Sequence, residues 1–492
     1  MKSKWNLVIH DCCQSTVNIW VGTLFPDLRK PELCSVVLLD NNLQQVACAD
    51  ITRQDWLRPF SRVNDRFYQF INFPHLNANT TYQVQFIRRA QQIGSITLSE
   101  KILASGSFKT LPAQLSQTQP FVVAMGSCFY NEGDNGDASG AYTELYFNGD
   151  AINKPDVKFF TGDQVYLDIG LDSLSPVPCE VRKRIADDYA ATWQTQRQML
   201  RHGATWFLAD DHEYWNNYPY TSGKNPYLWM LTAFKNIRSA WSQTASSAVK
   251  NVQQIRLFRS FNLANDLSVC FVDVRSQRDK GAAPKKMLPN KTFKQLITWA
   301  KSLISPGVIV LPQPLLVHKG GELDWNLANY SEQYQTLLQA LSFSGHDIVC
   351  LTGDVHFGRI AKVEFGEQGA ILHEIIASPM SNLTGLDGKV AASSPEKLLK
   401  FPTSAISGVP IRKVQYEKSW AVSTQRVKFL RFFSYKKTKE HFMTLAFNKT
   451  ADNNVKILVQ AWRIRERYKN TGLPKAEFKQ HHEIILKKQT QQ

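Results

Sequence analysis

The amino-terminal part of the chain, from residue 1 to about 113, has the alternation of apolar and polar residues typical of short β-strands. The alternation is clearest at residues 17–21, 35–39 and 82–86, and turn-forming residues such as those at 40–42 separate the runs. Short strands at this spacing favour a β-sandwich of the immunoglobulin or fibronectin-III kind. A Gln- and Ser-rich stretch that ends at Pro120 then predicts a linker and a domain boundary.

From residue 120 the pattern changes to apolar strands that alternate with amphipathic helices. Buried strands are predicted at residues 121–125, 157–160, 205–209, 267–274, 308–311 and 347–352. Helices are predicted at 180–201, 228–245, 290–304 and 328–343, the first of which places Val181, Ile185, Tyr189, Trp193 and Leu200 close to one face. This alternation predicts a mostly parallel or mixed sheet that helices cover on both faces.

After about residue 395 the pattern weakens, and residues 401–440 are rich in basic side chains. This region holds nine Lys or Arg residues and two Glu residues, with the aromatics Phe429, Phe432, Phe433 and Tyr435 between them. It is either a contact for nucleic acid or an anionic membrane surface, or a solvated loop with a few core aromatics. Residues 442–447 and 455–464 predict a closing β-hairpin, and we expect the charged tail at 465–492 to fray.

Composition is that of a folded, soluble protein with anionic partners. Hydrophobic residues make up 43% of the 492 positions and charged residues 20%, while the formal net charge is +16. We find neither a signal peptide nor an apolar run of the roughly 18 residues that a membrane span needs. Eight cysteines without the spacing of a disulfide framework fit a reducing compartment. We therefore expect a cytoplasmic monomer.

Four of the predicted strands run directly into polar clusters at their carboxyl ends. These clusters are Ser127-Cys128, Gly162-Asp163 with Tyr166, Asp210-Asp211-His212-Glu213, and Gly353-Asp354-Val355-His356. In open α/β sheets the site lies beyond the carboxyl ends of the strands, so these loops are expected to converge. A thiol, a phenol, carboxylates and imidazoles together are metal ligands.

Each of these residues also has a structural interpretation when it is taken alone. A lone Asp163 after glycine would begin a turn, and a lone Cys128 would be an inert buried thiol. The adjacent Asp210 and Asp211 are different, because two neighbouring carboxylates repel each other unless a cation or an arginine lies between them. The combination, with each cluster after an apolar strand, indicates a metal site.

At these residues the chain resembles the alkaline phosphatase D-like (PhoD-like) metallophosphatases of the calcineurin-like metallophosphoesterase superfamily. The blocks that carry the resemblance are Gly162-Asp163-x-x-Tyr166, Asp210-Asp211-His212-Glu213-x-x-Asn216-Asn217 and Gly353-Asp354-Val355-His356, with further matches at Ser127-Cys128, 273–278 and 378–381. The likeness covers about residues 10–385 and the hairpin to 464. It implies a fibronectin-III-like sandwich followed by a four-layer αββα catalytic domain at 120–464.

The resemblance also implies a site with two or more metal ions. Asp163 would bridge two metals, while Tyr166, Cys128 and His356 would bind an iron-like centre. Asp354 would serve the neighbouring ion, for which Asp210, Asp211 and Asn217 are the other candidate ligands, with the choice between the two aspartates left open. Phenolate and thiolate suit Fe³⁺, and hard oxygen ligands suit Ca²⁺, Mg²⁺ or Mn²⁺, with Zn²⁺ as a further alternative.

The expected activity is hydrolysis of phosphate monoesters or diesters through in-line attack by a metal-bound hydroxide. His212 is the candidate general acid for the leaving oxygen. Arg275 would either clamp a phosphate oxygen or form a salt bridge that holds the ligand loops. The alternative is a non-catalytic basic module that binds nucleic acid or an anionic membrane surface.

Overall fold

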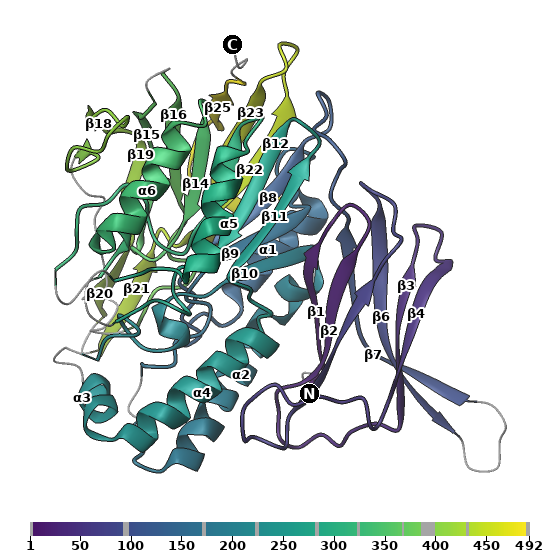
Figure 1. The fold of residues 1–492 in the computed structure, drawn as a ribbon. Helices are drawn as coiled ribbons and strands as arrows, with labels where there is room; N and C mark the ends of the chain where they lie inside the picture. The colour runs from purple at the N-terminus through teal and green to yellow at the C-terminus, as the bar shows by residue number, and fades with distance from the viewer. Residues whose placement is uncertain are drawn as a thin grey trace.

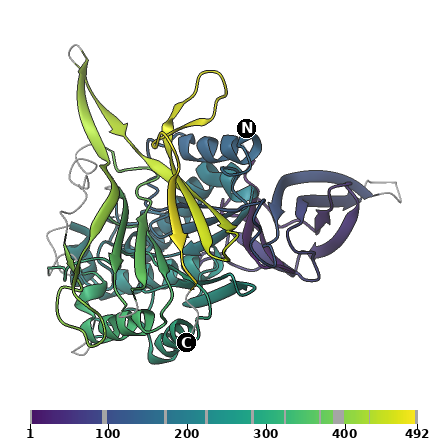
Figure 2. The same ribbon diagram turned by 90° about the horizontal axis from the view of Figure 1, so that it is seen from above.

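The first seven strands form two antiparallel sheets that pack face to face as a β-sandwich. The computed structural model describes residues 3–488 except 92–97, 170–173, 222–225, 281–284, 322–324, 367–368, 385–398 and 430–431. One sheet has the order β1(Asn6–Cys12)-β2(Val17–Thr23)-β5(Phe67–Phe73), and the other β4(Gln45–Thr52)-β3(Leu33–Leu39)-β6(Thr81–Gln91)-β7(Leu98–Lys109). Inward side chains such as Ile19, Val36 and Phe86 fill the space between them. Seen from above, the sandwich lies to one side of a larger α/β body (Figure 2).

The α/β body contains two seven-stranded sheets. The first has the order β10(Ala204–Leu208)-β9(Val157–Thr161)-β8(Phe121–Gly126)-β22(His441–Lys449)-β23(Val455–Arg467)-β24(Pro474–Ala476), with β25(His482–Leu486) also paired to β23. The second has the order β11(Phe258–Leu263)-β12(Leu267–Val272)-β13(Gly307–Val310)-β14(Ile348–Thr352)-β16(Ile371–Ile376)-β15(Phe357–Glu364)-β19(Gln415–Ala421). β8 to β10 are parallel in the first sheet, as are β12, β13, β14 and β16 in the second.

The two sheets pack against each other, and helices cover their outer faces. Val123, Phe159 and Val349 point into the core between the sheets. Side chains at alternate positions point outward, toward α1(Asp137–Asn148), α2(Pro178–Arg201) and α4(Lys235–Asn251) on one side, or α5(Asn290–Lys301) and α6(Ser331–Ser342) on the other. The result is a mixed α/β body of four layers, helix, sheet, sheet and helix (Figure 1). This confirms the expected fold class.

Local predictions hold best where apolar runs are long. The six predicted buried strands and the closing hairpin are present, with ends that differ by at most three residues. The predicted helix at 228–245 is instead two helices, α3(Pro226–Ala233) and α4, because Phe234 between them has an extended backbone. Pattern reasoning predicted one sheet, whereas the resemblance correctly implied two.

Two expectations for the carboxyl-terminal region are wrong. The tail after residue 465 does not simply fray, because Ile484 and Leu486 of β25 alternate with exposed residues and enter the core beside β23. The basic region is not a plain solvated loop either. It supplies β19, which pairs with β15, the short pair β17(Lys400–Phe401) and β18(Arg412–Lys413), and a hairpin of β20(Ser423–Phe429) and β21(Phe432–Thr438).

Candidate metal centre and active site

The loops that follow β8, β9, β10 and β14 meet at one edge of the two sheets, as the sequence predicted. Asp163, Asp210, Asp211 and Asp354 each place a carboxylate oxygen within 4.8 Å of the others. His212 completes a second such group with Asp163 and Asp211. Four of these five residues follow strands of the first sheet and Asp354 follows a strand of the second, so the cluster exists only because the sheets pack face to face.

The backbone in these loops is held in an unusual conformation. Cys128, Asp163, Asn217, Asp354 and His356 all have positive φ values of 54°, 55°, 60°, 72° and 52°. Non-glycine residues rarely adopt this left-handed region, and such strain concentrates at functional sites. Residues of neighbouring loops also pack so tightly against Gly162 and Gly353 that no side chain fits at either position. A Cβ atom at position 162 would lie 2.6 Å from the Cβ of Asp210, and one at 353 would lie 2.4 Å from the Ser127 side chain.

Negative charge exceeds positive charge in the cluster. Burial, with the other carboxylates, raises the pKa of Asp163 and of Asp210 well above the ordinary value. Arg275 forms a buried ion pair with Asp210 and lies 3.7 Å from Asp211. Burial disfavours the charged form of Asp211, but Arg275 and His212 outweigh it and lower its pKa.

Arg275 alone does not satisfy the three buried carboxylates of Asp163, Asp210 and Asp211. Oδ2 of Asp210 and Oδ1 of Asp211 are buried and have no hydrogen-bond partner within the described structure. Buried oxygens of this kind are costly unless a cation or a donor reaches them. The donor set therefore fits hard cations, and each of the two aspartates has an oxygen to offer.

Softer candidate ligands lie on the other side of Asp163. The Cys128 thiol is 3.4 Å from Oδ2 of Asp163, and the Tyr166 hydroxyl is 3.3 Å from Nε2 of His356. Burial and the adjacent carboxylates raise the pKa of the thiol, so it keeps its proton unless a cation supplies positive charge. Asp163 is the residue common to both sets of ligands.

Neighbouring amides orient two of these side chains. Asn382 Oδ1 lies 2.8 Å from Nδ1 of His356 and also accepts from the Leu383 backbone N–H, so Nδ1 of His356 is the donor. That leaves Nε2 without its proton and able to act as a ligand, and burial lowers the pKa of this imidazole to about 4. Gln313 donates to Asp354 at 3.0 Å and accepts from Arg278 at 2.6 Å.

His212 is held from two sides beside the carboxylates. Its Nδ1 lies 2.6 Å from Oδ1 of the buried Asp168, and its ring stacks on Tyr166 with centroids 4.2 Å apart. Burial would lower the pKa of His212, but the Asp168 carboxylate more than offsets this and holds it well above the ordinary value. Oδ2 of Asp168 accepts from the backbone N–H of Asn216, which fixes the carboxylate.

The two remaining predicted residues lie at the margin of the cluster. Arg275 forms the salt-bridge arrangement, since Nε contacts Asp210 and Nη1 donates to the Tyr218 carbonyl at 3.1 Å. Its role as a phosphate clamp stays a prediction. The backbone N–H of Asn217 donates to Asp211 at 2.6 Å, and its Oδ1 accepts from the Trp325 backbone N–H at 3.3 Å.

Sequence reasoning missed the residues that support the ligands. They are Asp168, Glu213, Gln313 and Asn382. Glu213 accepts from the backbone N–H groups of Asp163, Gln164 and Asp210, and so ties the loop after β9 to the loop after β10. Burial raises its pKa to about 7 despite these donors. Glu213 and Asp168 stand within or next to the quoted blocks, so their position was the available signal.

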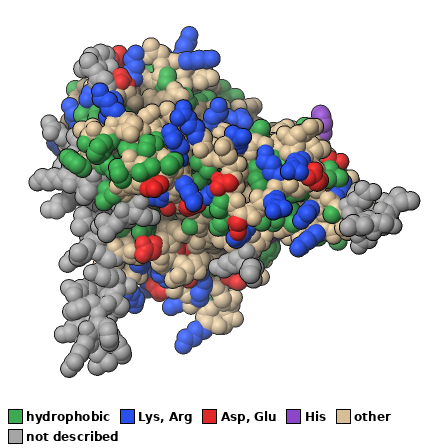
Figure 3. Space-filling model, turned by 90° about the horizontal axis from the view of Figure 1, so that it is seen from below, with side chains coloured by type: hydrophobic (Ala, Val, Ile, Leu, Met, Phe, Trp, Pro, Cys, Tyr) green, Lys and Arg blue, Asp and Glu red, His purple; other side chains and the backbone are tan. Residues whose placement is uncertain are grey.

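One residue of the basic region, Lys437, lies beside the loop that holds Cys128. The side chains at 425–435, which include Arg426, Lys428, Arg431 and all four predicted aromatics, lie outside the described residues. Lys437 of β21 is 3.2 Å from the Ser381 hydroxyl, and the Ser381 backbone N–H donates to the Cys128 carbonyl. On the face seen from below, Lys and Arg side chains are spread among other residues and do not form one patch (Figure 3). In the described part of the chain, none of the helices has the length and apolarity needed to cross a bilayer.

The fold and the cluster define a two-sheet α/β protein with a carboxylate-rich site of the kind that holds metal ions. The solved structure of PhoD matches it with a TM-score of 0.63 at 16% identity, over 99% of this chain and 92% of that chain. The chain therefore has the PhoD fold, as the resemblance implied. The β-glucuronidase of Bifidobacterium dentium aligns with a TM-score of only 0.24 at 9% identity, over 69% of this chain and 57% of that chain. The β-glucuronidase of Parabacteroides merdae aligns with a TM-score of only 0.25 at 9% identity, over 96% of this chain and 69% of that chain. Neither a protein-family model nor a curated protein sequence matches the chain.

Proposed function

We propose that the protein is a metal-dependent phosphoesterase that hydrolyses phosphate monoesters or diesters. The observation that carries the proposal is the group of four aspartates from both sheets, three buried and Asp354 half-buried, next to a thiol, a phenol and an imidazole. The match to PhoD over nearly the whole chain supports it at the level of the fold. The softer set, Cys128, Tyr166 and His356, suits Fe³⁺, and the carboxylates suit Ca²⁺, Mn²⁺ or Mg²⁺.

Bound cations would neutralise the phosphate charge and activate a water molecule. Asp163, common to both ligand sets, would fix the separation of the cations. Asn382 keeps Nε2 of His356 unprotonated, and Glu213 keeps the Asp163 and Asp210 loops at a constant distance. This chain thus supplies a preorganised site, which needs little rearrangement when charge develops on the ester.

His212 would protonate the leaving oxygen. Nδ1 is engaged by Asp168, so Nε2 is the atom that would hold the transferred proton. The Asp168 carboxylate raises the pKa of His212 and so favours the protonated ring, the form that a general acid requires. Tyr166 stacks on the ring and prevents it from rotating away.

The test is the Asp163→Ala variant, with Asp452→Asn as a control at an exposed carboxylate in the β22–β23 turn. Metal content, circular dichroism and turnover of a panel of monoesters and diesters would be measured on each protein. We expect Asp163→Ala to stay folded, to lose bound metal and to lose nearly all activity, whereas Asp452→Asn behaves as wild type. Undiminished turnover by Asp163→Ala would refute the proposal. A metal-loaded wild type that hydrolyses no ester but binds nucleic acid or anionic vesicles would favour the basic binding module.

A further inference from the structure

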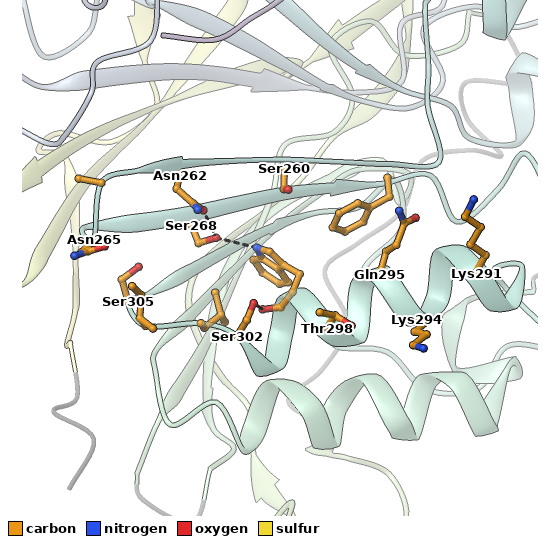
Figure 4. Close-up of a pocket in the computed structure, with 15 residues that line it drawn as sticks. Ser260, Asn262, Asn265, Ser268, Lys291, Lys294, Gln295, Thr298, Ser302 and Ser305 are labelled. Carbon is orange, nitrogen blue, oxygen red and sulfur yellow. Dashed lines mark hydrogen bonds between the residues drawn. The ribbon is translucent and has the colours of Figure 1, made fainter.

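A hollow of about 600 Å³ lies between the edge strand β11 and helix α5, away from the metal centre (Figure 4). The strand contributes Phe258, Ser260 and Asn262, which lie at alternate positions and so share one face. The helix contributes one stripe of its surface, formed by Lys291, Lys294, Gln295, Thr298, Trp299 and Ser302. Binding pockets for small molecules have volumes in this range, on the order of 300–1,000 Å³.

The hollow is lined by groups that hydrogen-bond, where a helix packed on a sheet is normally apolar. Leu296 and Ala300 of α5 pack in the core, whereas Ser260, Asn262 and Thr298 face the opening and are exposed. Figure 4 shows these short polar side chains along both walls. These polar side chains are too short to contact one another across the gap, so the space between the strand and the helix is open to solvent.

A relay of hydrogen bonds fixes the amide at the centre of the hollow. The indole Nε1 of Trp299 donates to the Ser268 hydroxyl at 2.9 Å, and that hydroxyl donates to Oδ1 of Asn262 at 2.7 Å. The amide is therefore oriented with its nitrogen away from Ser268. Nδ2 of Asn262 has no hydrogen-bond partner in the described part of the chain, so two N–H groups are available to a ligand.

Both ends of the hollow are basic, with two lysines of α5 at one end and, at the other, Lys488, whose ammonium donates to the Asn265 carbonyl at 3.1 Å. Lys291 and Lys294 stand at the end nearest the start of α5, and Asn265 and Ser305 stand at the other (Figure 4). Neither Lys291 nor Lys294 forms an ion pair within the described residues, and none of the described residues that line the hollow is acidic. A ligand that fits carries negative charge at the end where these two lysines stand and hydroxyl groups along its length.

We propose that this hollow binds an anionic sugar, with its acidic group at Lys291 and Lys294 and its hydroxyls on Asn262 and the serines. Aromatic rings beside amide and hydroxyl groups suit the alternating apolar and polar faces of a sugar ring, and Trp299 and Phe258 supply the rings. The proposal does not depend on the phosphoesterase activity, since no lining residue belongs to the metal centre.

Isothermal titration calorimetry with galacturonate, galactose 6-sulfate, galactose and inorganic sulfate tests the inference. Wild-type protein should bind both anionic sugars, and galactose and sulfate at least about tenfold more weakly, a difference of roughly 1.4 kcal/mol. The Lys291→Ala/Lys294→Ala variant should lose at least tenfold in affinity for the anionic sugars, and Ser260→Phe, which fills the hollow, should abolish binding. Lys301→Ala, on the same helix but outside the hollow, is the matched control.

Two results would overturn the proposal. Unchanged galacturonate binding in the double lysine variant would place the sugar elsewhere, and sulfate binding as tight as galacturonate would mean that only an anion is recognised. Asn262→Ala serves as a second probe should Ser260→Phe unfold, and it should weaken binding of every sugar without weakening that of sulfate. Phosphoesterase turnover of each variant is measured in parallel, so a failure here stays separate from a failure of the proposed activity.

Discussion

The contact between Asp168 and His212 makes the sharpest prediction about the proposed reaction. Asp168→Asn keeps the volume of the side chain and an oxygen for the Asn216 N–H, but removes the negative charge 2.6 Å from the imidazole. A hydrogen bond to a charged group contributes about 1.5–3 kcal/mol and a neutral one about 0.5–1.5 kcal/mol. The substitution should therefore cost about 1–2 kcal/mol in the transition state, or roughly a 5- to 30-fold loss of kcat.

Asp168→Ala removes the hydrogen bond entirely and should cost about 1.5–3 kcal/mol, or roughly 10- to 150-fold. The loss should appear with alkyl phosphates, whose leaving oxygen needs a proton, and should be small with nitrophenyl phosphates, whose leaving group does not. KM and bound metal should stay unchanged, because Asp168 is absent from the clustered carboxylates.

The assay measures kcat and KM for both kinds of ester on metal-saturated wild type, the two Asp168 variants and His212→Ala. In His212→Ala the additional Asp168→Asn change should have no further effect, since the carboxylate acts through that ring. An equal loss on alkyl and nitrophenyl esters would refute the role of His212 as acid. Loss of metal from Asp168→Asn would show that the carboxylate supports the ligands and does not position a proton donor.

Three further predictions follow from the geometry. Gly162 has φ 95°, and a Cβ added there would lie 2.6 Å from the Cβ of Asp210, so Gly162→Ala should cost about 2–4 kcal/mol of stability and release metal. Gly136 has φ 88° with nothing within 4 Å of the added Cβ, so the control Gly136→Ala should cost only about 1 kcal/mol; denaturant unfolding measures both. Burial lowers the pKa of His10 to about 3, so the unfolded chain binds a proton at this site that the folded one does not, and His10 alone should contribute about 2 kcal/mol to the loss of stability from pH 7 to pH 5. His10→Gln should flatten that dependence, and an unchanged slope would contradict it. Chelation should lower Tm in wild type, added Ca²⁺ or Mn²⁺ should restore it, and Asp163→Ala should respond to neither, which differential scanning calorimetry would measure.

The sequence predicted the candidate site because its residues follow apolar strands in short blocks. Asp163, Asp210 and Asp354 could be proposed together from that position alone, since carboxyl ends of neighbouring strands share an edge. Which sheet each strand joins was not visible, because a buried strand has the same apolar pattern in either sheet. The two-sheet arrangement was expected only through the resemblance.

The supporting residues were hidden for a different reason. Asn382 lies 26 positions after His356 and Gln313 lies 41 positions before Asp354, and an isolated amide has no pattern that marks its partner. The strands β19 and β25 were missed because neither has a long apolar run: the adjacent Glu417 and Lys418 interrupt β19, and β25 is only five residues long within a charged tail. Long-range pairing with β15 and β23, which local periodicity does not encode, decides their structure.

The distribution of charge links the fold to the proposed chemistry. The chain carries a formal net charge of +16, yet four carboxylates lie together at the edge where the two sheets meet. Without cations this edge would repel a phosphate ester that the rest of the surface attracts. Five residues with left-handed backbone, held by rigid sheets and by Glu213, keep the carboxylates close in spite of their repulsion. Cations bound at this edge would offset that cost, and under the proposed function they would turn a cluster of negative charge into a place that holds an anionic ester.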